Sequence, residues 1–131
     1  MLSVMLSLRL EWDRKILSGE KKADIRKSIP TGAPGYTCPF RVFLYETKAQ
    51  KGVGAVVGEC VCYCADEVQD YGIVTEFSCL TEWQLAQYAR GRKIYAWFLA
   101  EVVKYADPKP LSAFGIDRAP QSWCYVERSA A

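Results

Sequence analysis

The sequence has no histidine among its 131 residues. Catalytic triads of the Ser-His-Asp and Cys-His kinds depend on an imidazole as the general base, so both are excluded. Zinc hydrolases with histidine ligands and Cys₂His₂ zinc fingers are excluded for the same reason. Any enzyme with this sequence must move protons through carboxylate, lysine, tyrosine or cysteine side chains.

Long apolar segments are also absent. No window approaches the run of about 20 apolar residues that a membrane-spanning helix needs. The apolar stretch from Met1 to Leu8 has no basic residue before it and no small-residue cleavage site after it, and Arg9 interrupts it. The sequence therefore predicts a soluble, cytoplasmic protein without a membrane partner.

The C-x-x-C spacing typical of zinc sites is missing, although the chain has six cysteines. Cys60, Cys62 and Cys64 alternate with other residues, which on a regular strand would put all three on one face. They could form a thiolate metal site or pack as reduced thiols, as expected in the cytoplasm. We favour packing, because free cysteine is often buried and no histidine can complete a coordination sphere. We accordingly expect no metal and no cofactor.

The composition is that of an ordinary globular protein, with 50% hydrophobic and 24% charged residues. The length predicts one domain over residues 1–131, large enough to bury a core without disulfides. The charge is uneven: residues 1–51 hold ten basic and five acidic side chains, residues 52–89 hold six acidic and none basic, and residues 90–131 hold seven and four. The fold could separate a basic from an acidic face, or the charges could mix on its surface.

Hydrophobic periodicity predicts a mixture of strands and short helices. Alternating apolar residues predict strands at 6–10, 22–27, 41–47, 53–64, 94–105 and 123–127, with a proline-rich loop at 28–39. Helical spacing predicts helices at 11–18 and 80–88, and a third short helix fits within 65–78. This order favours the α+β class, as a small mixed β-barrel of five to six strands covered by two or three short helices.

The stretch Ile16–Arg26 resembles the signature of the ASCH domain, a branch of the PUA-like superfamily. In that family a short helix ends in a Gly-x-Lys turn, and the next strand carries an acidic or hydroxyl residue followed by arginine. Gly19, Lys21, Asp24 and Arg26 occupy those places. The runs Val56-Val57-Gly58-Glu59 and Pro120-Gln121-Ser122-Trp123-Cys124-Tyr125-Val126 add weaker matches, so the resemblance extends from about Leu6 to Val126.

The resemblance implies a PUA-like pseudo-barrel with a cleft beside it. It also implies RNA or nucleotide-like ligands, with hydrolytic activity in some branches. The amidohydrolase branch uses a lysine, a threonine and a glutamate, and it resembles this chain at Lys21. Asp24 stands where that branch has its threonine, and Leu10 stands where family members often have proline.

Lys21, Asp24 and Arg26 can be weighed by their chemistry alone. In an extended strand Asp24 and Arg26 point the same way, roughly 7 Å apart, with Lys21 in the turn before them. Arginine can bind phosphate through two nitrogens, and lysine acts as a point charge. Asp24 could orient either cation or accept a hydrogen bond from a base, and a buried Lys21 could act as a base or nucleophile. The alternative is a strand with surface ion pairs of little energetic value. Because the family pattern includes these residues, we favour a functional site.

Glu59 is a second candidate, because it lies within an otherwise apolar strand. A carboxylate is costly there unless it is paired. It either lines the cleft opposite Lys21 or points to solvent.

Several aromatic residues lie near predicted strand ends or loops, where bases could stack on them. They are Trp12, Tyr45 and Trp123. For each of them taken singly, we favour packing in the core or at its rim. Lys48 joins the candidates as a further cation for phosphate.

The leading functional hypothesis is an RNA- or nucleotide-binding module with a basic cleft. Its expected contacts are Lys21, Asp24, Arg26, Lys48, Tyr45 and Trp123. The alternative is a small hydrolase, either an amidohydrolase of an N-acylated cytidine or a ribonuclease, in which Lys21 is the base and Asp24 or Glu59 assists. A third possibility is a protein-interaction domain that uses the acidic segment 52–89.

Overall fold

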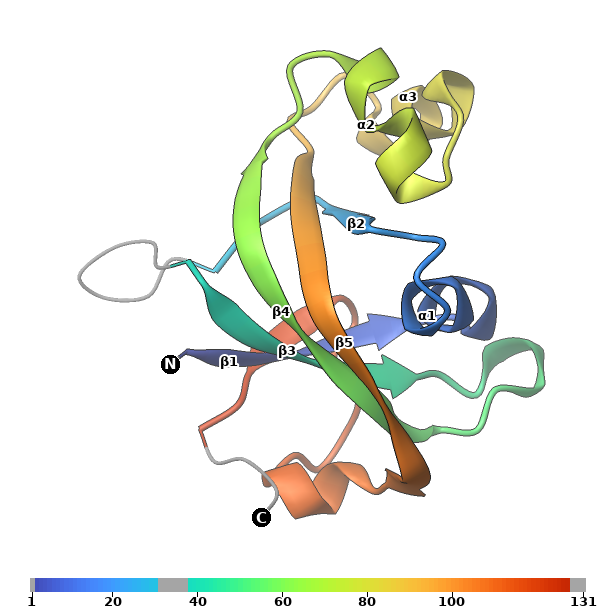
Figure 1. The fold of residues 1–131 in the computed structure, drawn as a ribbon, viewed down its shortest axis with the longest axis vertical. Helices are drawn as coiled ribbons and strands as arrows, with labels where there is room; N and C mark the ends of the chain where they lie inside the picture. The colour runs from blue at the N-terminus through green and yellow to red at the C-terminus, as the bar shows by residue number, and fades with distance from the viewer. Residues whose placement is uncertain (1, 31–37, 128–131) are drawn as a thin grey trace.

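A computed structural model describes residues 2–30 and 38–127. The strands are β1 (Ser3–Leu8), β2 (Ala23–Arg26), β3 (Phe40–Glu46), β4 (Ala55–Glu67), β5 (Tyr95–Lys109) and β6 (Trp123–Tyr125). They form one sheet in the order β2-β5-β4-β3-β1-β6, in which β1 and β3 are parallel and all other neighbours are antiparallel. The long strands β4 and β5 cross over β1 and β3, so the sheet curls into a half-barrel (Figure 1).

Three α-helices accompany the sheet: α1 (Leu10–Leu17), α2 (Tyr71–Ser78) and α3 (Glu82–Ala89). Short 3₁₀ helices, η1 (Ala49–Lys51) and η2 (Leu111–Phe114), follow β3 and β5. Helices α2 and α3 lie together at one end of the β4–β5 pair, and α1 lies beside β2 (Figure 1). The predicted α+β class, with a mixed sheet of six strands and short covering helices, is confirmed for the described residues. No helix in the described part of the chain is long and apolar enough to cross a membrane.

Several element boundaries differ from those that periodicity predicted, and two of these differences have a clear structural cause. The first strand covers residues 3–8 rather than 6–10, because Arg9 takes an extended conformation as the N-cap of α1. Strand β5 continues through Pro108, which we expected to end it. Beyond Leu99, β5 pairs with β4 alone. A proline is tolerated there because one side of the strand carries no ladder hydrogen bonds.

Bulges overturn the predicted faces of β4 and β5. The pairing register shifts between Cys62 and Cys64, so Cys60 and Cys62 are buried whereas Cys64 is exposed. An extra residue in one strand reverses the alternation of the side chains that follow it. The three cysteines therefore do not share one face. No group of three metal-ligating side chains in residues 2–30 and 38–127 could hold a metal ion.

Simple alternation would put Trp97, Leu99 and Val103 on one face of β5, and the same effect separates them. Glu101 has a positive φ of 52°, and the register with β4 shifts nearby. Trp97 and Leu99 before this point are buried, but Val103 after it is 53% exposed. Val102 packs against the main core instead.

The main core fills the concave side of the curled sheet, and α1 contributes to it. Its fully buried members include Leu6, Ile16, Val42, Cys60 and Trp97. The ring of Phe40 packs edge-on against Trp97, with ring centroids 5.4 Å apart. A second cluster includes Met5, Phe43 and Phe114, and a third joins α2 and α3 to β2 and β5. The first cluster thus packs α1 against the sheet, and the third packs α3 against it.

We predict that Gly58→Ala destabilises the protein by about 1–3 kcal/mol, because Gly58 is where β5 and α1 approach β4 closely. A Cβ at this position would lie 2.5 Å from the carbonyl oxygen of Val103 and 2.8 Å from Leu17 Cδ2. Urea unfolding measures the effect. Gly72→Ala is the control: there the nearest atom, 3.3 Å away, belongs to the exposed Asp70 side chain, and alanine is the better helix former. Equal unfolding midpoints for Gly58→Ala and the natural protein would contradict the prediction.

Candidate functional site: a cleft at the seam of the sheet

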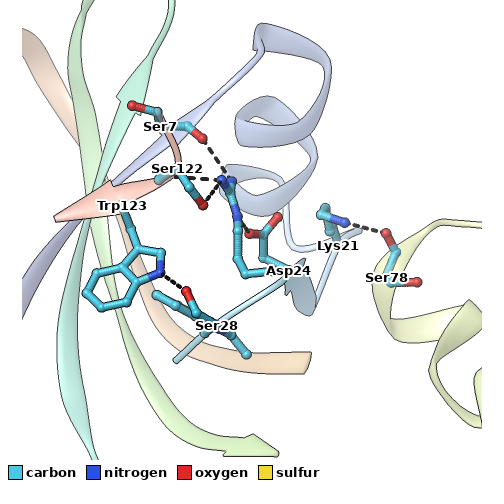
Figure 2. A network of polar contacts seen from close by, with 9 residues as sticks. Ser7, Lys21, Asp24, Ser28, Ser78, Ser122 and Trp123 are labelled. Atoms are coloured by element: carbon cyan, nitrogen blue, oxygen red, sulfur yellow. Dashed lines mark hydrogen bonds and ion pairs between the residues drawn. The ribbon is translucent and has the colours of Figure 1, made fainter. Parts of the chain in front are cut away.

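Strands β2 and β6 are the two edges of the sheet, and Arg26 joins them. Its Nε pairs with Asp24 Oδ2 at 2.5 Å. Its Nη2 donates to the carbonyl oxygen of Ser7 at 2.8 Å, and its Nη1 donates to the carbonyl oxygen and Oγ of Ser122 at 3.3 and 3.2 Å. Figure 2 shows this network between β2 and the residues beside β1 and β6. We call the junction between the β2 edge and the β1–β6 edge of the sheet the seam. Side-chain hydrogen bonds, rather than ladder hydrogen bonds between strands, therefore close it.

Two indole groups strengthen the same seam. Trp123 Nε1 donates to Ser28 Oγ at 3.0 Å (Figure 2), and Trp97 Nε1 donates to the Ser28 carbonyl oxygen at 3.1 Å. The two indole rings contact each other edge-on at 5.7 Å. Trp123 is thus held between the core and the chain that follows β2.

A cleft of about 560 Å³ opens along this seam. Strand β2 and the end of β1 form one part of its wall, and α1, the α2–α3 turn and α3 form another. Its polar and aromatic lining includes Arg9, Trp12, Lys21, Asp24, Arg26, Gln84 and Tyr88. The charged side chains of this lining are the cations Arg9, Lys21 and Arg26 and the carboxylate Asp24, which pairs with Arg26.

Lys21 reaches the cleft because the chain turns sharply after α1. Gly19, with a φ of 86°, makes the turn, and Lys21 N donates to the carbonyl oxygen of Lys15 at 2.9 Å. The Lys21 side chain is 3% exposed, its Nζ donates to the carbonyl oxygen of Ser78 at 2.5 Å, and it lies 5.0 Å from the centre of the Trp12 ring (Figure 2). Burial lowers the pKa of Lys21, while the charge of Asp24 partly opposes this.

The structure brings Lys21, Asp24 and Arg26 together in this one cleft, as the strand geometry predicted. Arg26 differs from expectation in its availability. Its guanidinium is 12% exposed and already donates to Asp24, Ser7 and Ser122. It closes the seam rather than presenting two free nitrogens to a phosphate.

The other predicted contacts lie outside the cleft lining. Glu59 pairs with Arg41 and accepts a hydrogen bond from Tyr105 Oη at 2.8 Å, on the face of β4 opposite Cys60. Tyr45 is only 6% exposed and packs in the second core cluster, so no base can stack on it. Lys48 is exposed in the turn after β3, and its stem packs near Gly54. Trp123 bonds to Ser28 and packs against Trp97 at the seam, as described above.

Arg9, Gln84 and Tyr88 line the cleft but were missed by sequence reasoning. The only feature of Arg9 in the sequence that could have indicated a functional role is that it interrupts an apolar stretch. Gln84 and Tyr88 come from α3, which reaches the cleft only because α2 and α3 fold back over β2. Trp12, one of the stacking candidates, does line the cleft.

A second polar arrangement lies on the other side of α1. Asp13 is completely buried, and no donor in the described residues forms a hydrogen bond to either of its carboxyl oxygens. It contacts Glu46, which is 2% exposed and accepts hydrogen bonds from Val53 N at 2.8 Å and Arg14 Nε at 3.3 Å. Burial, followed by the contact with Glu46, raises the pKa of Asp13 to about 8.

Comparison with known proteins gives a fold but no sequence family. No protein-family model matches the sequence, and no curated protein matches it. Among solved structures, ASCH from Zymomonas mobilis superimposes with a TM-score of 0.76 at 23% sequence identity, over 96% of this chain and 88% of that one. The chain has the ASCH fold.

Two variants of the Zymomonas mobilis ASCH protein give the same result. One has a serine replaced by alanine (TM-score 0.76, 22% identity, 96% of this chain and 89% of that chain). The other has a tyrosine replaced by phenylalanine (TM-score 0.75, 22% identity, 96% and 91%). The ASCH resemblance drawn from the Gly-x-Lys turn and the following Asp-x-Arg strand is confirmed at the level of fold. In this ASCH fold the turn after α1 places Lys21 in the cleft, and β2 carries Arg26, which closes the sheet.

Proposed function

We propose that the seam cleft binds a nucleotide or a short single-stranded segment of RNA. The observation that carries this proposal is the convergence of Lys21, Arg9, Trp12 and Tyr88 on one cleft of about 560 Å³. This volume lies within the range of about 300–1,000 Å³ common for small-molecule sites. The ASCH resemblance, which implies RNA or nucleotide-like ligands, points in the same direction.

The proposed roles follow from exposure and hydrogen bonding. Arg9 is exposed and can meet a phosphate, and Lys21 adds a positive charge deeper in the cleft. Trp12 and Tyr88 supply aromatic faces for a base. Gln84 Oε1 is engaged by the Thr81 N–H at 2.9 Å, so its amide NH₂ is the part that can donate to a base edge. Asp24 holds Arg26 and shapes the wall.

We predict that Lys21→Met weakens binding of a fluorescein-labelled single-stranded RNA by about tenfold or more, because a charge at the cleft floor is lost. Fluorescence anisotropy at several salt concentrations measures this, and the affinity of the natural protein falls as salt rises. Lys22→Met is the control, since Lys22 is an exposed neighbour that does not line the cleft. Absence of RNA binding at low salt, or binding that does not depend on salt, would refute the proposal.

The buried Lys21 favours one second candidate, a small hydrolase acting on an N-acylated cytidine or on RNA. Its pKa is lowered by burial, so a larger fraction of its amine is neutral and able to accept a proton. Asp24, 4% exposed and nearby, is the carboxylate that could assist. Glu59 has no part in this candidate, because it lies outside the cleft lining. Turnover of an N-acylated cytidine or of RNA that persists in Lys21→Met would exclude this chemistry.

We further propose a cytoplasmic location, where the thiols stay reduced. All six cysteines of the chain lie in the described residues, and none of them forms a disulfide. Burial raises the pKa of Cys60 to about 12, so this thiol resists oxidation in any case.

A further inference from the structure

Helix α2 carries apolar residues on its exposed surface as well as on the side that packs on the protein. Val74 faces inward at 5% exposure and joins the third core cluster. Ile73 and Phe77, one helical turn apart, are 66% and 41% exposed. A helix at the surface of a protein normally turns polar residues outward, and a helix that is apolar all round is normally covered.

Neighbouring aromatic rings extend this surface across the sheet. Phe77 contacts Phe98 of β5 with ring centroids 5.7 Å apart, and Phe98 contacts Tyr63 of β4 at 6.3 Å. Tyr63 is 53% exposed. Together Tyr63, Ile73, Phe77 and Phe98 form what we call the α2 patch. Contiguous exposed apolar groups with a polar rim are typical of protein interaction sites.

A groove of about 240 Å³ runs beside the α2 patch. Its apolar part comes from Val74, Ala96 and the patch residues Ile73 and Phe98. The volume is below the range of about 300–1,000 Å³ of small-molecule sites, so the groove suits an inserted side chain better than a free ligand.

The rim of the groove is acidic. Asp66, Glu67 and Asp70 line it, and Glu76 is exposed on α2. These residues belong to segment 52–89, which has no lysine or arginine. Lys93 pairs with Glu67 at 3.7 Å but is 72% exposed, so it neutralises little of this charge. The exposed Lys22 is another nearby cation, because its backbone N–H donates to the Phe77 carbonyl oxygen.

We propose that the α2 patch is a docking surface for a basic segment of a partner protein, which places an apolar side chain in the groove and lysine or arginine on the acidic rim. The sign of the charge decides the class of partner. Nucleic acids and anionic membranes would be repelled by this rim, whereas a basic polypeptide is attracted. The surface is distinct from the proposed RNA cleft, although the Ser78 carbonyl oxygen that holds Lys21 ends the same helix.

The test uses the full chain and a fluorescein-labelled peptide of lysine and leucine, with its leucines at helical spacing. The same peptide with glutamate in place of lysine is the charge control. We expect the lysine peptide to bind and the glutamate peptide not to bind. Ile73→Glu and Asp66→Lys should each weaken binding by about tenfold, as for residues at the centre of an interface. Both residues are exposed, so neither change disturbs the core.

Two matched variants control for exposure and charge. Val103→Glu replaces an apolar residue that is 53% exposed on β5, and Asp117→Lys reverses an exposed acid that follows η2, at the opposite end of the molecule from α2 (Figure 1). Neither should change binding. The proposal is overturned if the lysine peptide does not bind, if both peptides bind alike, or if the controls weaken binding as much.

Two further results would assign the surface to another occupant and also overturn the proposal. One is a dimer of the natural chain in sedimentation that Ile73→Glu dissociates, which would point to a second copy. The other is loss of RNA binding in Ile73→Glu. Because Lys21→Met tests the cleft separately, failure of the docking surface and failure of the RNA cleft are distinguishable.

Discussion

Replacing Arg26 with alanine is expected to lower the free energy of unfolding by about 3–5 kcal/mol, the cost of breaking a buried ion pair by removing one partner. Arg26 is 12% exposed, and its partner Asp24 is 4% exposed. The substitution leaves the Asp24 carboxylate buried without its bonded cation. It also removes the hydrogen bonds to Ser7 and Ser122 that hold the two edges of the sheet together. Urea unfolding followed by circular dichroism measures the loss.

Two variants test this explanation. Lys15→Ala removes a cation from the ion pair with Glu20, whose members are 40% and 61% exposed, and should cost less than about 1 kcal/mol. Adding Asp24→Asn to Arg26→Ala should restore part of the stability, because the unpaired buried group is then neutral. If Arg26→Ala lowers the free energy of unfolding no more than Lys15→Ala does, the contacts of Arg26 do not contribute to closure of the sheet.

The second large effect concerns Asp13: Asp13→Asn is expected to stabilise the protein near pH 8 and to have little effect near pH 4. In the folded protein, burial and the neighbouring Glu46 raise the pKa of Asp13 from 3.8 to about 8. Burial alone would raise the pKa of Glu46 too, but its hydrogen bonds to Val53 and Asp13 and its contact with Arg14 lower it. Asp13 therefore keeps its proton and donates it to Glu46, which gives the otherwise unpartnered carboxyl a partner.

The sign of the pH dependence follows from proton binding. Between pH 3.8 and about 8 the folded state holds the Asp13 proton and the unfolded state does not. Raising the pH through this window therefore lowers the free energy of unfolding of the natural protein. Asparagine does not titrate and can still donate to Glu46, so the variant avoids this loss. At about 1.4 kcal/mol per pKa unit, we expect a gain of several kcal/mol at the alkaline end of the window.

Urea unfolding at a series of pH values measures this gain. Glu11→Gln removes an exposed carboxylate from the same helix and is the control for a general change in charge. A constant difference between Asp13→Asn and the natural protein across the window would show that Asp13 is not held protonated.

Prediction from the sequence succeeded where local pattern decides structure. Alternation located all six strands, and the Gly-x-Lys turn with the Asp-x-Arg strand pointed to the ASCH fold. It failed where a bulge reversed a strand's faces, as at Cys64 and Val103. A bulge depends on how two strands pair, and the sequence of one strand does not encode the partner's register.

The site shows the same division. Strand period two is a local property, so Asp24 and Arg26 were correctly expected on one face, with Lys21 beside them. For Glu59 the sequence left the cleft and the solvent face equally open, because its partners Arg41 and Tyr105 come from two other strands. Tyr45 looked like a residue near a strand end, but the cover provided by Phe114 and its neighbours turned it into core.

By itself the sequence determined, through the lack of histidine, that any proton transfer here must use carboxylate, lysine, tyrosine or cysteine side chains. Through local periodicity it also determined the order of strands and helices. Only the tertiary structure decided how those residues are used. Arg26 became the clamp of the seam because its acceptors Ser7 and Ser122 lie 19 and 96 residues away in the chain and meet only when the sheet curls. Lys21 became buried because the end of α2, 57 residues further on, covers it. Burial and ion pairing depend on contacts between residues that are distant in the chain. The sequence therefore determines which chemical groups are present, and the fold determines their charge state and their role.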